Sequence, residues 1–145
     1  MITIKHIDAS ETYLFRQTIL RPNQPLEDCK YPSDYETDSF HLGGFLNDAL
    51  VSIASFSQEI YPDLPNGIHY RLRGMATSPT FRNQRAGSSL IHKAEQILQE
   101  RNANILWCNG RITVTNYYKL LGFLEHGEIF EIDNLGLHKV MYKEL

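Results

Sequence analysis

The stretch LRGMATSPTFRNQRAGSSLIHKAEQIL, residues 72–98, changes its hydrophobic period partway along. Its first part belongs to His69–Ser78, where side chains of opposite character alternate as in a half-buried strand. From Gly87 onward the apolar residues recur at helical spacing, which is typical of a helix packed on a sheet. These apolar residues are Leu90, Ile91, Ala94, Ile97 and Leu98. The stretch therefore predicts a strand, a loop and a helix in direct succession.

The loop between this strand and this helix has the features of an anion site. The first N–H groups of a helix have no partner within the helix, and the helix dipole favours negative charge beside them. Arg82 and Arg85 add charged donors, so a phosphate group fits there. The loop matches neither G-x-G-x-x-G nor G-x-x-x-x-G-K-[ST], so neither a dinucleotide fold nor a P-loop is indicated. A capped loop with a solvated basic face is an equal alternative at this point.

Upstream of this stretch, the sequence predicts a strand, a short helix and a hairpin. Residues 2–6 alternate in hydrophobicity, and Ser10 is a candidate N-cap for a helix over Tyr13–Leu20. Residues 22–37 contain three prolines and predict a loop without regular structure. Asn47-Asp48 then joins two apolar stretches into a predicted hairpin. The two stretches are Phe40–Leu46 and Ala49–Phe56.

Downstream, the sequence predicts three more strands and one more helix. The helix covers Thr115–Leu121 and ends at Gly122, a residue type that favours helix C-termini. The strands cover Ile105–Cys108, Phe123–Phe130 and Leu137–Tyr142. This order of elements predicts an α/β (α+β) fold with a mixed sheet. The last strand could also form the edge of a homodimer.

Length and composition exclude several classes of protein. A chain of 145 residues with 42% hydrophobic content predicts a single domain over residues 1–145. Fourteen Lys and Arg against 17 Asp and Glu give a net charge of −3, which excludes the basic footprint of a general nucleic-acid binder. No apolar run could span a membrane, and the first residues do not resemble a signal peptide. We therefore expect a soluble, cytoplasmic protein with no nucleic-acid or membrane partner.

The cysteines and histidines do not suggest a metal site or a disulfide framework. Cys29 and Cys108 lie far apart, and the six histidines show no metal-ligand spacing, so we predict no metal. Cys108 is expected to be a buried thiol beside Trp107. It has no base near it in sequence, so an acyl-cysteine intermediate is not expected.

The helix over Thr115–Leu121 carries two adjacent tyrosines that point in different directions. A phenol with a pKa near 10 can protonate a basic leaving group, so one of them could act as a general acid. Taken alone, this segment is more readily explained by two tyrosines that pack where the helix meets the sheet.

Together, however, the two segments resemble the GNAT superfamily of N-acetyltransferases, in particular its small single-domain bacterial members. The resemblance rests on Arg82-x-x-Arg85-x-Gly87 followed, one strand later, by Tyr118-Lys-x-x-Gly-Phe123. It implies a mixed, mostly antiparallel sheet with helices on both faces and splayed central strands. It also implies an enzyme that transfers the acetyl group of acetyl-CoA to a primary amine by direct attack, the amine being on a small molecule or a peptide.

The resemblance also implies which residues form the site. Tyr118 corresponds to the general acid that protonates the departing CoA thiolate. The residues implied in acetyl-CoA binding are Met75, Ala76, Thr77, Arg82, Asn83, Gln84, Arg85, Ala86, Gly87, Ser88 and Asn109. Arg85 stands where the family has a glycine. We expect the site to persist if φ at this residue is negative, because the backbone amides are still present.

The rest of the acceptor site is left open by the sequence. The candidate bases that would deprotonate the amine are His41, Glu131, Asp133 and His138. Arg71, Arg73 and Arg111 could dock an acidic substrate, although solvated strand faces explain them equally well. The alternative to an enzyme is a non-catalytic acyl-CoA-binding or protein-interaction module on the same fold.

Overall fold

The predicted strand, loop and helix are present in the computed structural model, which describes residues 1–145. Strand β4 spans His69–Thr77 and a 3₁₀ turn spans Pro79–Phe81. Helix α2 then spans Ala86–Glu100. The prediction of a strand, a loop and a helix in this segment is therefore confirmed, to within one or two residues at each boundary.

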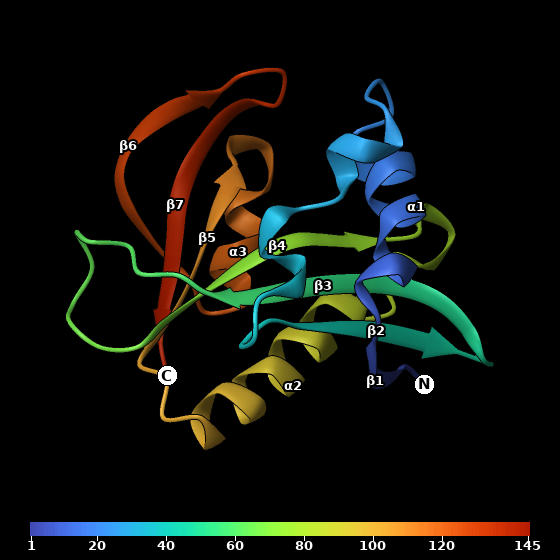
Figure 1. Ribbon diagram of the computed structural model, residues 1–145, viewed down its shortest axis with the longest axis horizontal. Helices are drawn as coiled ribbons and strands as arrows, with labels where there is room; N and C mark the ends of the chain where they lie inside the picture. Colours follow the sequence, from blue (N-terminus) through green and yellow to red (C-terminus); the bar gives the residue numbers. More distant parts are fainter.

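The seven strands form one sheet in the order β1-β2-β3-β4-β5-β7-β6, which Figure 1 shows running from β6 at the left to β1 at the right. All neighbouring strands are antiparallel except β4 and β5, which are parallel. The sheet is thus mixed and mostly antiparallel, as expected. The other strands are β1 (Thr3–Ile7), β2 (Phe40–Leu46), β3 (Ala49–Gln58), β5 (Ile105–Arg111), β6 (Leu124–Ile132) and β7 (Gly136–Glu144).

The two parallel strands separate soon after they meet. They pair only from His69↔Ile105 to Arg71↔Trp107, although each strand continues beyond these positions. A bulge in β4, where the register with β3 shifts, accompanies the separation, and Gly74 lies there with a φ of 61°. Such a bulge bends a strand and increases its twist. The predicted splay of the central strands is therefore present.

Both faces of the sheet are covered. On one face, α2 buries its apolar stripe, for example Leu90 and Leu98, against strand residues such as Leu42, Phe56 and Leu106. The short helix α3 (Thr115–Leu120) contributes Tyr118 to the same core. The opposite face carries a smaller apolar cluster and the N-terminal helical segment. The cluster consists of Leu64, Ile105, Trp107 and Val140. Cys108 and Trp107 therefore lie on opposite faces, and Cys108 is buried as predicted.

The N-terminal helical segment differs from its prediction. Its cap is Asp8, not Ser10, because the Asp8 backbone N–H donates to Glu11 Oε2 at 2.7 Å in a capping box. The segment then passes from a 3₁₀ turn into α1 (Tyr13–Phe15) and a π-helical turn over Arg16–Leu20. The region 22–37 also has local structure, since two 3₁₀ turns form within it. They span Leu26–Cys29 and Pro32–Tyr35.

The hairpin prediction is confirmed, whereas the edge prediction is wrong. Asn47 and Asp48 have φ values of 50° and 67°, as a tight two-residue hairpin turn requires. Strand β7 is not a free edge, because β5 and β6 pair with it on its two sides. Homodimerisation itself stays a prediction. No helix of the chain is long and apolar enough to cross a membrane.

Candidate active site

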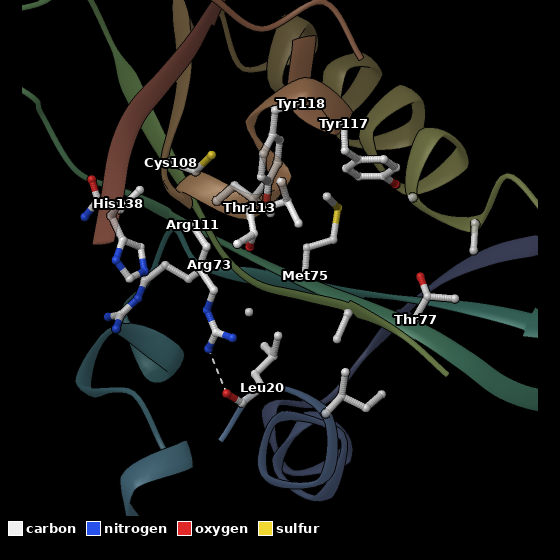
Figure 2. Close-up of a pocket in the computed structure, with 18 of the residues that line it drawn as sticks. Leu20, Arg73, Met75, Thr77, Cys108, Arg111, Thr113, Tyr117, Tyr118 and His138 are labelled. Atoms are coloured by element: carbon white, nitrogen blue, oxygen red, sulfur yellow. Dashed lines mark hydrogen bonds between the residues drawn. The ribbon is translucent and has the colours of Figure 1, made fainter. Parts of the chain in front are cut away.

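A cavity of about 950 Å³ opens where β4 and β5 separate. Its walls come from both splayed strands, the start of α2, helix α3 and the N-terminal helical segment. Figure 2 shows Met75 and Tyr118 near its middle, Thr77 toward one side, and Arg73 and His138 toward the other. The cavity is therefore long, and its two ends are built from different parts of the chain.

One end of the cavity is the N-terminus of α2. Arg85 precedes the helix as its N-cap, but no side chain caps the helix, and its first turn contains no acidic residue. The first N–H groups of the helix therefore lack both a hydrogen-bond acceptor and a balancing negative charge. The loop and helix residues that line this end are Arg82, Asn83, Arg85, Ala86, Gly87 and Ser88. This end is suited to bind a phosphate.

The backbone of this loop does not meet the condition of a negative φ at Arg85. Its φ is 60° and its ψ is 27°, so it lies in the left-handed region and not at negative φ. Asn83 also has a positive φ, of 70°. Residues that alternate between right- and left-handed conformations turn their N–H groups toward one point, which makes an anion-binding concavity. Arg85 thus adopts a conformation natural for glycine, at a cost of about 1 kcal/mol.

Gly87 is required for space and not for its backbone angle. A β-carbon at this position would collide with the Tyr117 hydroxyl, which lies directly over the helix start. Tyr117 lines the cavity as well, with 42% of its surface exposed. Sequence reasoning did not assign Tyr117 to the site. The short spacing between Gly87 and a tyrosine on the next helix becomes visible only in three dimensions.

The middle of the cavity lies between the open strand edges. Met75, Ala76 and Thr77 line it from β4, and Asn109 lines it from β5. The side-chain oxygen of Asn109 is buried and has no hydrogen-bond partner. Buried polar atoms are nearly always paired, so this oxygen marks a place where a donor from a ligand belongs.

Tyr118 and Cys108 meet above this region (Figure 2). Burial raises the pKa of Tyr118 well above 10.0, and a negative charge on Cys108 would raise it further. Burial also raises the pKa of the Cys108 thiol from 9.0 to about 12, against a smaller opposing effect of its hydrogen bond with Tyr118. Near neutral pH both groups hold their protons. Tyr118 is therefore a proton donor, and Cys108 is a poor nucleophile.

Of the four candidate bases, only His138 lines the cavity. Its Nδ1 lies 2.8 Å from the Gly136 carbonyl oxygen, which can only accept, so Nδ1 carries the proton. In the neutral ring Nε2 is then a free proton acceptor. His41 is buried elsewhere and bonds Ser55 and the Asp34 carbonyl oxygen. Glu131 and Asp133 do not line the cavity.

The structure thus brings almost all of the predicted site residues to one cavity, and Gln84 is the exception. Arg71, Arg73 and Arg111 also line it, so they are not simply solvated strand positions. Sequence reasoning missed several other lining residues, including Leu20, Arg21, Tyr31, Thr113 and Leu135. The only sequence signal for Arg21 and Tyr31 was their place in or beside the proline-rich region 22–37.

No group of three or more His, Cys, Asp or Glu side chains in the chain is arranged to hold a metal ion. The expectation of no metal stays a prediction.

The fold and the cavity are those of a protein suited to bind an extended ligand with a phosphate at one end. The model of the acetyltransferase (GNAT) family matches residues 6–123. The chain is also 49% identical over 145 residues to the Bacillus subtilis (strain 168) protein named uncharacterized N-acetyltransferase YitI, covering 100% of this chain and 97% of that one. The chain therefore belongs to the acetyltransferase (GNAT) family and is an acetyltransferase.

Solved structures agree on the fold. Escherichia coli ElaA superposes with a TM-score of 0.76 at 22% identity, over 99% of this chain and 100% of that chain. The NatC complex bound to Gag peptide and CoA contains a chain that superposes with a TM-score of 0.74 at 12% identity, over 99% of this chain and 98% of that one. A non-catalytic binding module is not favoured by these relationships. Enzymes of the family use acetyl-CoA as their acetyl donor and act on an acceptor substrate.

Proposed function

We propose that this chain, as a single domain over residues 1–145, transfers acetyl from acetyl-CoA to a primary amine by direct attack and without a metal. One observation carries the proposal. The uncapped N-terminus of α2 and the open edges of β4 and β5 line one cavity, and Tyr118 lies near its middle. A phosphate-bearing donor with an extended amide arm fits such a path.

The residues along this path fit the parts of acetyl-CoA in order. The pyrophosphate would be held by the loop and first turn at 82–88, where backbone N–H groups converge and Arg82 and Arg85 add charge. The open β4 edge at Met75–Thr77 would pair with the amide groups of the pantetheine arm. The unpartnered Asn109 oxygen would accept a hydrogen bond from one of its N–H groups.

The chemistry is divided between two side chains. When bound, acetyl-CoA supplies the thioester carbonyl that the amine attacks and the C–S bond that breaks. His138 Nε2 would take the proton that the amine must lose to form a neutral amide. Tyr118 would give its phenolic proton to the sulfur that leaves, and would regain one through His138 or solvent. The products are then a neutral amide and the CoA thiol, with no net change in protons.

The proposal is tested by Tyr118→Phe, which removes the hydroxyl and keeps the ring. We expect kcat for an amine acceptor to fall about 100-fold, the lower range for loss of a positioned acid, while the affinity for acetyl-CoA stays about the same. Acetyl-CoA at about 100 times its Kd should raise the free energy of unfolding by about 2.7 kcal/mol in both proteins. Tyr35→Phe is the matched control, because Tyr35 is 74% exposed and does not line the cavity.

Two outcomes would contradict the proposal separately. An unchanged kcat in Tyr118→Phe would remove this residue from the role of acid. No stabilisation by millimolar acetyl-CoA would remove the donor assignment itself.

A further inference from the structure

The side of the cavity away from α2 is rich in arginine and contains no acid. Arg71 and Arg73 reach it from β4, Arg111 from the end of β5, and Arg21 from the segment after the π-helical turn. No Asp or Glu is among the residues that line the cavity. A protein with a net charge of −3 thus places only positive charge in this wall.

These arginines differ in how many hydrogen bonds and ion pairs their guanidinium groups form within the chain. Arg71 forms an ion pair with Glu59 at 3.3 Å. Arg21 and Arg111 each donate to a backbone carbonyl oxygen at 2.7 Å, that of Asp28 and Leu20 respectively, and neither has a carboxylate partner. Arg73 has neither a hydrogen bond nor an ion pair within the chain, although it is half-buried.

Arg73 is held in place without being neutralised. Its guanidinium lies 4.0 Å from the centre of the Tyr31 ring, so a cation–π contact fixes its position. Burial, and then the positive charge of Arg71, lowers the pKa of Arg73 from 12.5 to about 10. Removing an unpaired charge from water costs several kcal/mol, and an anionic ligand would offset that cost.

Arg73 and Arg111 point toward the same end of the cavity as His138, and Leu20 forms the wall beside Arg111 (Figure 2). Thr77, which leads to the α2 end, lies on the far side of Tyr118 in the same view. This positive end is therefore separate from the phosphate site. Apolar residues also lie near it: Leu20 beside Arg111, and Ile132 and Leu135 from the turn that precedes His138.

We infer that the acceptor is a small amino-carboxylate, whose carboxylate binds Arg73 and Arg111 while its amine faces His138. The inference rests on the proposed function. A planar guanidinium matches a carboxylate with two parallel hydrogen bonds, and two such groups at one end of a cavity select for an anion over a neutral isostere. The apolar residues limit the rest of the acceptor to a short carbon chain.

The test compares short amino acids, each with its own carboxamide, as acceptors for the wild-type chain and for Arg73→Gln. The wild type should prefer the carboxylate about 10-fold or more in kcat/KM, since a hydrogen bond to a charged group contributes about 1.5–3 kcal/mol. Arg73→Gln should lower kcat/KM for the carboxylate about 10- to 100-fold, mainly through KM, and change the amide about 3-fold at most. Arg73→Lys should recover part of the loss, because it restores the charge but not the two-pronged geometry.

The matched control is Lys93→Gln, which removes one positive charge from the exposed face of α2, outside the cavity. It should leave the preference unchanged. A second readout needs no turnover: calorimetry of the N-acetylated amino acid and its amide against the CoA-loaded protein should show the same preference in Kd.

Equal kcat/KM and equal Kd for carboxylate and amide would overturn the inference, as would an equal loss for both in Arg73→Gln. If acetyl-CoA binds and no amine is acetylated, the proposed function fails instead. In that case the acceptor assignment fails with it, and the calorimetric preference shows only whether the arginine end of the cavity binds a carboxylate.

Discussion

Three arginines lie against the Tyr31 ring, and the two nearest to it, Arg16 and Arg73, behave in opposite ways. Arg16 lies 3.8 Å and Arg73 lies 4.0 Å from the centre of the Tyr31 ring. Arg16 is fully buried and bonds both oxygens of Asp34, at 2.8 and 2.9 Å, together with Ser55 at 2.7 Å. Arg73 has no acid beside it. The chain therefore balances one buried cation and leaves its neighbour without a counter-charge.

The difference distinguishes Arg16, whose charge stabilises the fold, from Arg73, whose charge we propose binds a ligand. A buried ion pair that the chain completes by itself holds elements together, here the N-terminal helical segment, the Pro32–Tyr35 turn and β3. A half-buried cation without a partner is costly to the empty protein, and the cost falls when an anion arrives. Two other residues of the cavity wall, Cys108 and Arg85, are also held in states that are costly to the empty protein.

The largest effect on stability should come from breaking the buried Arg16–Asp34 ion pair. Asp34→Ala leaves Arg16 buried and uncompensated, so we expect the free energy of unfolding to fall by about 3–5 kcal/mol, measured by urea denaturation. Arg73→Gln should not lower it and should raise it somewhat, because no partner loses its charge and an unpaired cation is removed. Asp38→Ala is the control, since this aspartate is exposed and its side chain makes no contact with Arg16. Similar losses for Asp34→Ala and Arg73→Gln would remove the distinction between the two arginines.

A second effect concerns the pH dependence of stability, to which the buried, protonated thiol of Cys108 in the cavity wall should contribute. The pKa of the Cys108 thiol is raised from 9.0 to about 12, so from about pH 9 the unfolded chain ionises while the folded chain does not. The folded state then binds more protons, and stability falls as pH rises from about 9 toward 12. By about pH 10.5 the loss from this group should reach about 2 kcal/mol relative to neutral pH.

Cys108→Ala should remove this part of the pH dependence, measured as the free energy of unfolding in urea between about pH 8 and 10.5. Tyr118→Phe should act in the same direction above about pH 10, because the pKa of Tyr118 is also raised. Burial outside the cavity also raises the pKa of the Cys29 thiol from 9.0, so Cys29→Ala should reduce the pH slope as well, and the two effects should add in the double variant. A pH slope unaffected by Cys108→Ala would show that the thiol does not contribute.

The smallest effect should come from the other end of the cavity, where the cost is conformational. Arg85→Gly removes the strain of a left-handed arginine, and we expect a gain in stability of up to about 1 kcal/mol. Arg82→Gly is the matched control: Arg82 has a φ of −65°, so the same change should destabilise by about 0.5–1 kcal/mol. If both variants lose stability equally, Arg85 is not strained. A raised KM for acetyl-CoA in Arg85→Gly would show that its side chain also binds the donor.

The sequence was sufficient where the signal is local. The period change at 72–98 and the Asn47-Asp48 turn are each decided by residues near one another in the chain, and both were correctly predicted. The site at the start of α2 follows from the same local pattern. Even here the condition of a negative φ at Arg85 is not met, because the loop geometry overrides the intrinsic preference of an arginine.

The rest depends on contacts between distant segments. Tyr31 lies in a region that was expected to be an irregular loop, yet it places Arg73 in the cavity from another element. The position of β7 between β5 and β6 is a property of strand order, which hydrophobic alternation does not encode. The sequence alone does not distinguish His138 from the other candidate bases. The fold places His138 in the cavity wall and leaves Glu131 and Asp133 outside it.

The short stretch of pairing between β4 and β5 has a consequence for ligand entry. The ladder between the two groups of strands, β1–β4 and β5–β7, covers only the pairs from His69↔Ile105 to Arg71↔Trp107, although one hydrophobic core packs across both groups. Beyond these positions the edges of β4 and β5 are already open, while the hydrogen-bonded ladders on either side of the gap are complete. Ligand entry and product release then require no local unfolding.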